Sequence, residues 1–337
     1  GSAIIFRANT QLPGSNELVG LGGAGTEFKR DQVNQDGINF QKLNTYNAGL
    51  NLEYDMGPVT LYSITSYWNG NFRSRGDIDG GIAGNGPGLV PFSAQSQDNV
   101  PSLDQFTQEV RIASNNSSGL GYQLGAFYFD EKLDITSFEF FNPTDASPAA
   151  IATQRQTSEA YGIFGSVNYA FENGLKLQAG ARYNHDKRDF AADRLFDIRG
   201  FAGPPVPVIS TNVTGKLVTW DASASYAASD AVTVYARAAR GYRAPSVQGR
   251  LTFSSTISTA NQEKTMSYEA GVKTAFLDNR VRFNLTGYFF DTKDLQLTAV
   301  GGTSNVASLL NVDAKGHGIE AELQAAPAKG LTFSIGG

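Results

Sequence analysis

The chain has 337 residues, a net charge of −5 and 18% charged residues, fewer than the roughly 25% usual for soluble domains. It has no basic excess, which argues against a nucleic-acid partner. No window approaches the roughly 18 consecutive apolar residues of a transmembrane helix, so a helical membrane protein is excluded. A membrane β-barrel stays possible, because alternation of apolar and polar residues dilutes its hydropathy signal.

Residues 1–40 are rich in glycine and asparagine and are predicted to be loop. Beyond them, apolar and polar residues alternate along most of the chain, which is typical of strands with one apolar face. The alternating segments come in pairs separated by short turns, and each pair predicts an antiparallel hairpin. The six predicted hairpins, or 12 strands, occupy residues 46–72, 106–135, 161–184, 218–238, 268–289 and 319–335.

The first hairpin leaves one face assignment open. On the strand that follows its turn, Tyr62, Ile64 and Trp68 compete with Leu61 and Tyr67 for the apolar face. The alternation there therefore does not decide which side chains point outward.

The lengths of the connections indicate the class of fold. Turns of about three to five residues alternate with loops of about ten to thirty, as in outer-membrane barrels with short periplasmic turns and long extracellular loops. A long loop is expected at 73–103, a second around Phe138, Phe140 and Pro143, and a proline-rich third at 195–212. A soluble β-sandwich mixes its connection lengths. The sequence therefore predicts an all-β, antiparallel, up-and-down transmembrane barrel.

The fifth hairpin gives the clearest assignment of the two faces. The residues expected to face lipid are Tyr268, Val272, Val281, Phe283 and Leu285. Outward aromatic residues near strand ends fit interfacial girdles, and they are Tyr46, Tyr54, Tyr161, Tyr169, Tyr183, Trp220 and Tyr226. The charges expected on the opposite, inward face are Glu53, Glu109, Arg111, Lys176, Arg182, Asp221, Glu269, Lys273, Arg282, Glu320 and Glu322. They either line a ligand path or form pairs across neighbouring strands and with a plug.

Several motifs in this order resemble the barrel of TonB-dependent outer-membrane receptors. They are Leu61–Tyr67, Gln108–Ser114, Gly241–Ser246 (GYRAPS), Glu263–Thr265, Ser267–Lys273, Gly318–Leu323 and Leu331–Phe333. The resemblance implies a barrel of about 22 strands, closed by an N-terminal plug and coupled through a TonB box. Neither a plug nor a TonB box can be identified in the sequence. Residues 1–337 are therefore expected to be a partial barrel domain that corresponds roughly to the seventh to eighteenth strands and lacks the last strands.

The resemblance also implies a function. We expect a receptor in the outer membrane of a Gram-negative bacterium that imports a ferric siderophore or related iron complex. Its partners would be outer-membrane lipid, its own plug domain, the TonB energy complex and the ferric chelate. Glu269, Lys273, Glu320 and Glu322 would contact the plug.

Ligand capture is expected on the loops and the upper lumen, since binding residues concentrate on loops held by rigid scaffolds. Aromatic and arginine side chains suit large anionic ferric chelates, through stacking and charge-assisted hydrogen bonds. The candidates are Phe129, Phe138, Phe140, Arg188, Tyr242 and Arg243. The alternative for the aromatic residues is that they pack on one another.

Other functions have less support. A passive porin or an adhesin-like barrel would share the fold. Tyr242–Pro245 resembles a box of haem receptors, but Ala260–Glu263 stands where their companion Asn-Pro-Asn-Leu motif belongs. A barrel hydrolase needs a serine beside an oriented histidine, and neither His185 nor His317 shows that pairing. We predict no catalytic residue, metal site or cofactor.

Overall fold

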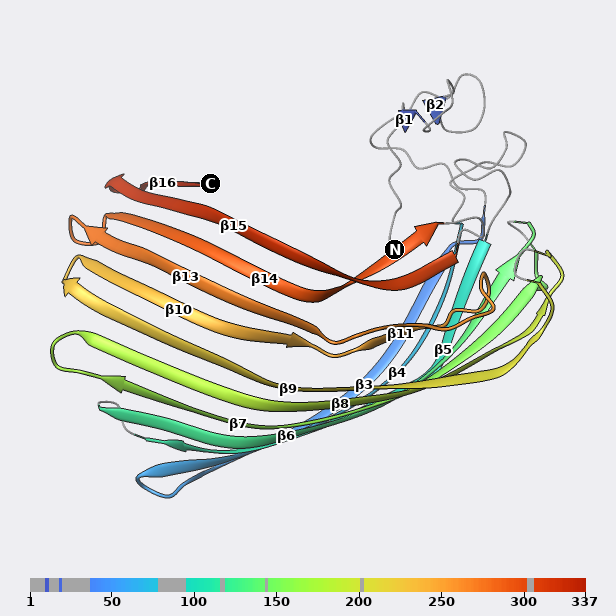
Figure 1. Ribbon diagram of the computed structural model, residues 1–337, viewed down its shortest axis with the longest axis horizontal. Coiled ribbons are helices and arrows are strands. Elements are labelled where there is room, and N and C mark those ends of the chain that lie inside the picture. Colours follow the sequence, from blue (N-terminus) through green and yellow to red (C-terminus); the bar gives the residue numbers. More distant parts are fainter. Residues whose placement is uncertain are drawn as a thin grey trace.

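The structure is a computed structural model that describes residues 10–11, 18–19, 37–77, 95–115, 119–142, 145–200, 203–301 and 306–337. One antiparallel sheet of 12 strands dominates it, and its strands follow one another in chain order (Figure 1). The predicted meander of 12 strands is therefore confirmed. No helix among these described residues is long and apolar enough to cross a membrane.

The main sheet is built from two groups of strands and is accompanied by two small hairpins. The first group is β3 (Phe40–Asp55), β4 (Val59–Asp77), β5 (Gln95–Ser114), β6 (Leu120–Phe140), β7 (Ala150–Ala170), β8 (Leu175–Asp197) and β9 (Val206–Ser229). The second group is β10 (Val232–Arg243), β13 (Glu263–Phe276), β14 (Val281–Gly301), β15 (Val306–Ala328) and β16 (Leu331–Gly336). The small hairpins are β1 (Thr10–Gln11) with β2 (Leu18–Val19), and β11 (Ser246–Gln248) with β12 (Ser258–Ala260).

Most strands are longer than the sequence predicts. β8 has 23 residues and β9 has 24, although about 9–11 residues cross a bilayer. The strands β4 and β5 extend into the loop expected at 73–103, and β8 and β9 extend into the loop expected at 195–212. Both loops are therefore shorter than predicted. Beyond the membrane both faces of a strand meet water or polar groups, so the alternation fades while the backbone ladder continues. Most of the loop expected at 1–40 lies outside the described residues.

The two faces of the sheet differ in chemistry. We call the face that includes Tyr268 and Leu285 the outer face, and the face that includes Glu269 and Lys273 the inner face. Tyr268 is 50% exposed and Leu285 37%, and no second layer covers either among the described residues. The ladder of β13 and β14 places on the outer face all five residues predicted to meet lipid, namely Tyr268, Val272, Val281, Phe283 and Leu285.

The face of β4 that the sequence leaves open is decided by its two neighbours. Leu61 pairs with Tyr54 of β3 and Ile112 of β5, so it lies on the outer face together with Tyr67. Tyr62, Ile64 and Trp68 alternate with these residues and lie on the inner face. The register of two adjacent ladders thus fixes what the apolar pattern of one strand cannot.

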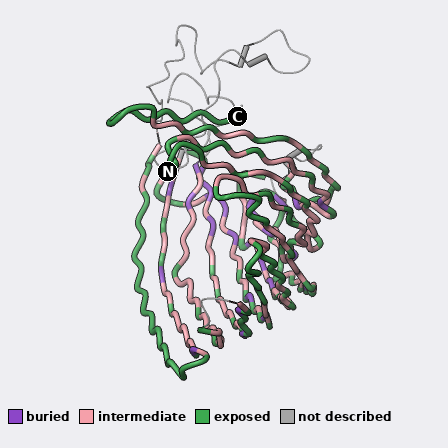
Figure 2. Tube along the Cα trace, turned by 90° about the vertical axis from the view of Figure 1, so that its left-hand side faces the viewer, coloured by how far each residue is buried: buried purple, intermediate pink, exposed green. Residues whose placement is uncertain are grey.

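The sheet is curved and open. β3 and β16 are its two edges, and Figure 2 shows both as exposed along almost their whole length. The long connections and the inner hairpin of β11 and β12 gather at one end of the strands, opposite the short turns (Figure 1). By the usual asymmetry of outer-membrane barrels, this is the extracellular end.

The assignment of the faces predicts unequal effects for two neighbouring substitutions. Leu285→Arg should cost about 2–4 kcal/mol of stability in a bilayer, because it places a cation in lipid. Asn284→Arg should be tolerated, because Asn284 lies on the inner face and donates to the Glu322 carboxylate at 3.4 Å. Urea titration of folding into lipid vesicles measures both. Equal losses would contradict the assignment of the faces.

Candidate functional site

Residues 244–262, which we call the inner segment, connect β10 to β13 and fold against the inner face near the extracellular end (Figure 1). Leu251 of this segment is fully buried, and it packs against Ala152, Phe190 and Ala192 of the strands β7 and β8. Val206, Ile209, Val247 and Ile257 surround this small apolar core. The segment is therefore bound to the wall by packing as well as by polar contacts.

Arg194 holds the inner segment through its backbone. The side chain lies on β8, is almost fully buried and donates from Nη1 to the carbonyl oxygens of Leu251 and Ser254, both at 2.8 Å. It also donates to the carbonyl oxygen of Pro204 at 2.6 Å. A buried guanidinium requires several acceptors, and three carbonyl groups from two connections supply them.

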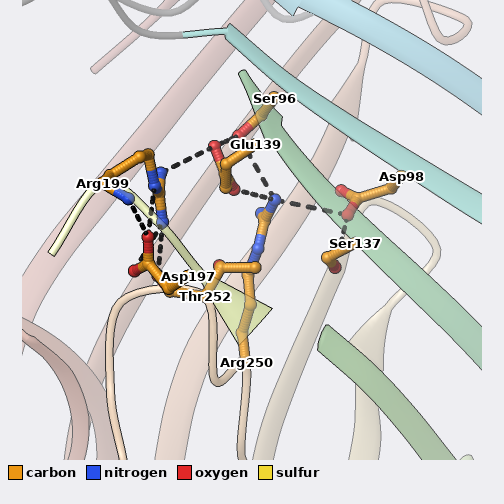
Figure 3. Close-up of polar contacts among 8 residues, drawn as sticks. All are labelled: Ser96, Asp98, Ser137, Glu139, Asp197, Arg199, Arg250 and Thr252. Carbon is orange, nitrogen blue, oxygen red and sulfur yellow. Dashed lines mark hydrogen bonds and ion pairs between the residues drawn. The ribbon is translucent and has the colours of Figure 1, made fainter. Parts of the chain in front are cut away.

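Glu139 is the centre of a second anchor, shown in Figure 3. Its carboxylate accepts a hydrogen bond from Ser96 Oγ at 2.6 Å and one from Arg250 Nη2, of the inner segment, at 3.1 Å. Arg199, which follows β8, lies 3.7 Å from Glu139 Oε2, the oxygen that also accepts from Ser96. Burial raises the pKa of Glu139, whereas Arg250, Ser96 and Arg199 act in the opposite direction.

The same guanidinium groups bind further partners (Figure 3). Arg250 lies 3.3 Å from Asp98 of β5, whose carboxylate also accepts from the Ser137 hydroxyl at 2.7 Å. Arg199 pairs with Asp197 at 3.1 Å and donates to the carbonyl oxygen of Thr252 at 2.8 Å. Five charged groups from β5, β6, β8 and two connections therefore meet at one point on the inner face.

The inner segment and the end of β10 also contain buried polar atoms without hydrogen-bond partners. Six buried side-chain polar atoms lack a hydrogen-bond partner among the described residues, and four of them lie between residues 242 and 252. They are Tyr242 Oη, Gln248 Oε1, Arg250 Nε and Thr252 Oγ1. Because buried polar groups are normally satisfied, this concentration marks the region where a polar ligand would gain most.

A cavity of about 650 Å³ on the inner face adjoins the start of this segment. Its volume lies within the range of small-molecule sites, roughly 300–1,000 Å³. The polar side chains around it include Arg182, Asn184, Asp221, Arg237 and Tyr242. Arg182 also lies over the rings of Phe127 and Phe164, at 5.2 and 5.6 Å. The cavity thus combines cations with aromatic surface.

Two of the predicted ligand residues come together here. Tyr242 borders the cavity, and burial together with the neighbouring Asp186 carboxylate raises its pKa, while Arg188 acts in the opposite direction. A Cβ atom at Gly215 would overlap the Tyr242 hydroxyl, so this strand position requires glycine. Arg188 is on the inner face of β8, since it alternates with His185 on the outer face.

Phe129 and Arg243 are placed differently. Phe129 lies on the inner face of β6, between Thr107 and Ala160 in the ladders. Arg243 is 63% exposed and lies 3.8 Å from Glu263. Both can be reached from the inner side, but neither borders the cavity.

The prediction that Phe138 and Phe140 lie in a loop is wrong. Both belong to β6, where they alternate with the inner residues Ser137 and Glu139 and therefore occupy the outer face. Phe140 is buried, and the Arg75 guanidinium lies 3.6 Å from its ring centre. The segment Ser137–Phe140 alternates hydroxyl or carboxylate with aromatic residues, which is a strand pattern that the neighbouring Asn142 and Pro143 obscured.

The four charges expected to contact a plug all lie on the inner face, and none forms an ion pair within the described part of the chain. Lys273 lies over the Tyr235 ring at 5.2 Å. Glu322 accepts hydrogen bonds from Asn284 and Gln324. Ion pairs across strands therefore do not account for Glu269, Lys273, Glu320 and Glu322.

Both histidines lie on the outer face. His185 stacks on Tyr161 with ring centres 4.5 Å apart, and His317 pairs with Phe289. Neither can therefore coordinate a haem iron inside the barrel. Among the described residues, no group of three or more His, Asp or Glu side chains could hold a metal ion.

The residues that anchor the inner segment are not among those predicted from the sequence. Glu139, Arg194, Arg199 and Arg250 lie outside the predicted hairpins, so their partners could not be inferred. Arg250 and Glu139 are 111 residues apart in the chain. Only the strand alternation at Ser137–Phe140 could have indicated that Glu139 points inward.

Comparison with known proteins identifies the fold. Residues 5–337 match the family model described as "TonB dependent receptor-like, beta-barrel". The chain is similar to the ferric yersiniabactin uptake receptor FyuA from Yersinia pestis, with a TM-score of 0.70 and 18% identity over 88% of this chain and 42% of that one.

Two further solved structures show the same likeness. The ferric-catecholate import receptor Fiu from E. coli K12, in its closed form, has a TM-score of 0.62 and 14% identity over 90% of this chain and 48% of that one. The siderophore receptor PiuA from Acinetobacter baumannii has a TM-score of 0.61 and 16% identity over 90% and 49%. The chain thus spans less than half the length of each of these three receptors.

The anchoring of the inner segment can be tested at Arg250. Arg250→Gln should favour opening of residues 249–254 by on the order of 2 kcal/mol, because a charged hydrogen bond to Glu139 and an ion pair with Asp98 are lost. Hydrogen exchange of these backbone amides measures the change. Arg155→Gln is the control, because the pair of Arg155 with Asp134 is exposed and such pairs contribute little. Unchanged exchange in R250Q would contradict the anchor.

Proposed function

The chain belongs to the TonB-dependent receptor-like β-barrel family, and we propose that it forms wall strands of a receptor that imports a ferric siderophore or related iron complex. The family is one of transport receptors, not of enzymes, and its members lie in the outer membrane of Gram-negative bacteria. The exposed apolar side chains of the outer face fit that membrane. We further propose that the open sheet is closed by strands outside this chain, since unpaired edges are costly in lipid.

The inner cavity is the observation that carries the ligand assignment. Arg182 and Arg237 border it together with Tyr242, which reaches the cavity from the end of β10, where pairing with β9 has ended. Arg188 of the inner face lies close to Tyr242. Cations and aromatic rings suit a bulky anionic chelate through charge-assisted hydrogen bonds and stacking. FyuA and Fiu are described as receptors for ferric yersiniabactin and ferric catecholates, which supports this class of ligand.

The inner charges support a plug as the second partner. A closed barrel of about 22 strands is wide enough to need a plug, and charges on the wall without ion pairs are suited to hold one. We assign this role to Glu269, Lys273, Glu320 and Glu322, which have no ion pair within the described residues. Moving a plug held by many polar contacts requires work, and the TonB energy complex would supply it.

Ligand capture is tested by alanine substitution on the two faces. Phe129→Ala, Arg188→Ala and Tyr242→Ala should each weaken binding of a ferric catecholate to the purified intact receptor by about tenfold, because each removes a stacking or charged contact. Arg243→Ala should have a smaller effect, since its side chain is 63% exposed beside Glu263. Fluorescence quenching measures the affinities.

The control for this experiment is Phe138→Ala, because Phe138 lies on the outer face. It should leave affinity unchanged. Binding that depends on Phe138 as strongly as on Phe129 would contradict the proposed location. Unchanged barrel melting would show that the losses at the inner positions are specific.

Energy coupling is tested in cells. Uptake of the radiolabelled ferric chelate should stop when the inner-membrane energy complex is deleted, while binding to the cell surface persists, because only movement of the plug needs energy. The measurement compares bound and internalised label in the two strains. Uptake that continues without the complex would indicate a passive pore.

A further inference from the structure

The outer face carries a groove that transport does not use. It runs across β8, β9, β10 and β13 with a volume of about 670 Å³, and its lining is almost wholly apolar. Its floor consists of alanines on three neighbouring strands, namely Ala179, Ala222, Ala224, Ala236 and Ala238. The ladders place them side by side, since Ala222 pairs with both Ala179 and Ala238.

Differences in side-chain size create the groove. Larger residues border it, with Leu120, Val167, Tyr169 and Leu177 on one side and Tyr268 on the other. Elsewhere the outer face is built from side chains such as Leu50 and Ile163, which are 55% and 59% exposed. A strip of alanine among such residues is recessed and has the width of two to three strands, about 5 Å each. It can therefore receive a linear apolar chain.

Basic side chains lie directly beyond the extracellular end of this groove. Arg240 follows Ala238 by two residues on the same face of β10, and its ladder partner on β9 is Trp220. Lys216 lies on the outer face of β9, where it pairs with His185. Lys264 lies on the outer face of β13, four residues beyond Tyr268. We call Lys216, Arg240 and Lys264 the basic triad.

The basic triad differs from three other cations of the outer face, each of which has an acidic partner. Lys187 pairs with Asp189 at 2.7 Å, Lys293 with Asp313 at 2.7 Å, and Lys315 with Asp291 at 3.4 Å. No member of the triad has an ion pair within the described part of the chain. Three adjacent strands thus present uncompensated positive charge next to an apolar groove.

We propose that this surface is a specific site for a membrane lipid of the outer leaflet whose head group bears phosphate. One acyl chain would lie along the alanine groove, and the phosphate would bind the basic triad. Trp220 is the ladder partner of Arg240 and Tyr268 that of Ala238, so these two aromatic residues stand where the groove meets the basic triad. Aromatic side chains of this kind mark the boundary of the membrane. A phosphate group at this boundary of the membrane would contact the basic triad while it stays in the membrane–water interface. The alanine floor lies on the face opposite to ligand capture, although Trp220 and Arg240 also border the inner cavity.

The experiment measures lipid retention by the intact receptor in native mass spectrometry. The probes are phosphatidic acid and phosphatidylcholine with identical acyl chains, because they differ only in the head group. Wild-type receptor should retain phosphatidic acid preferentially. Lys216→Gln should weaken that retention about fivefold, and the triple variant K216Q/R240Q/K264Q on the order of a hundredfold.

A second variant tests the groove. Ala222→Leu with Ala236→Leu fills the floor with apolar side chains that lipid tolerates, so folding should be preserved. This variant should lose retention of phosphatidic acid although its basic triad is intact. The matched controls are Lys132→Gln and Ala126→Leu on the outer face of β6, beyond the groove. Both should behave like wild type.

Two results would overturn the proposal. The first is retention of phosphatidic acid that is unchanged in the triple variant or in the groove variant while both are folded. The second is a stable dimer that A222L/A236L dissociates, since the groove would then bind a second copy of the chain. Loss of retention in both variants, with wild-type behaviour in both controls, would establish the lipid site.

Discussion

The structure depends on the pairing of backbone N–H and C=O groups along the strands. In lipid no water can satisfy these groups, so each strand must be hydrogen-bonded to a neighbour along the whole of its buried length. The ladders from β3 to β16 meet this requirement without crossing connections. Local bulges, such as the one opposite Gly70 and Phe72, shift the register but do not end a ladder.

Continuous ladders place successive side chains on opposite faces of the sheet, and this separates apolar side chains from charged ones. The outer face has apolar side chains in contact with lipid, and the inner face has charges above aromatic rings. Arg182 lies over the Phe127 ring and Lys273 over the Tyr235 ring, each at 5.2 Å, and neither has an ion pair among the described residues. An aromatic ring stabilises such a cation without neutralising it, so the inner wall keeps its charge for partners.

Beyond the membrane the same strands form the support of the inner segment. Arg194 is almost fully buried and Glu139 is buried beside Arg250, which is costly unless every charge has partners. Here those partners come from distant parts of the chain, so the contacts favour one placement of the segment over others. The cavity beside Tyr242 thus adjoins an anchored segment at the extracellular end of the inner face.

The sequence by itself determined the number of strands, their hairpin order and the outer set around Leu285, because period-two alternation is a local property that lipid enforces. It did not determine the ends of β5 to β9, the inner face of β4 or the orientation of Phe138. These features depend on the register between neighbouring strands. A single strand does not encode its register where both of its faces meet water or both are apolar. The anchor of Glu139 by Arg250 was decided only in three dimensions, since curvature of the sheet brings together residues 111 positions apart.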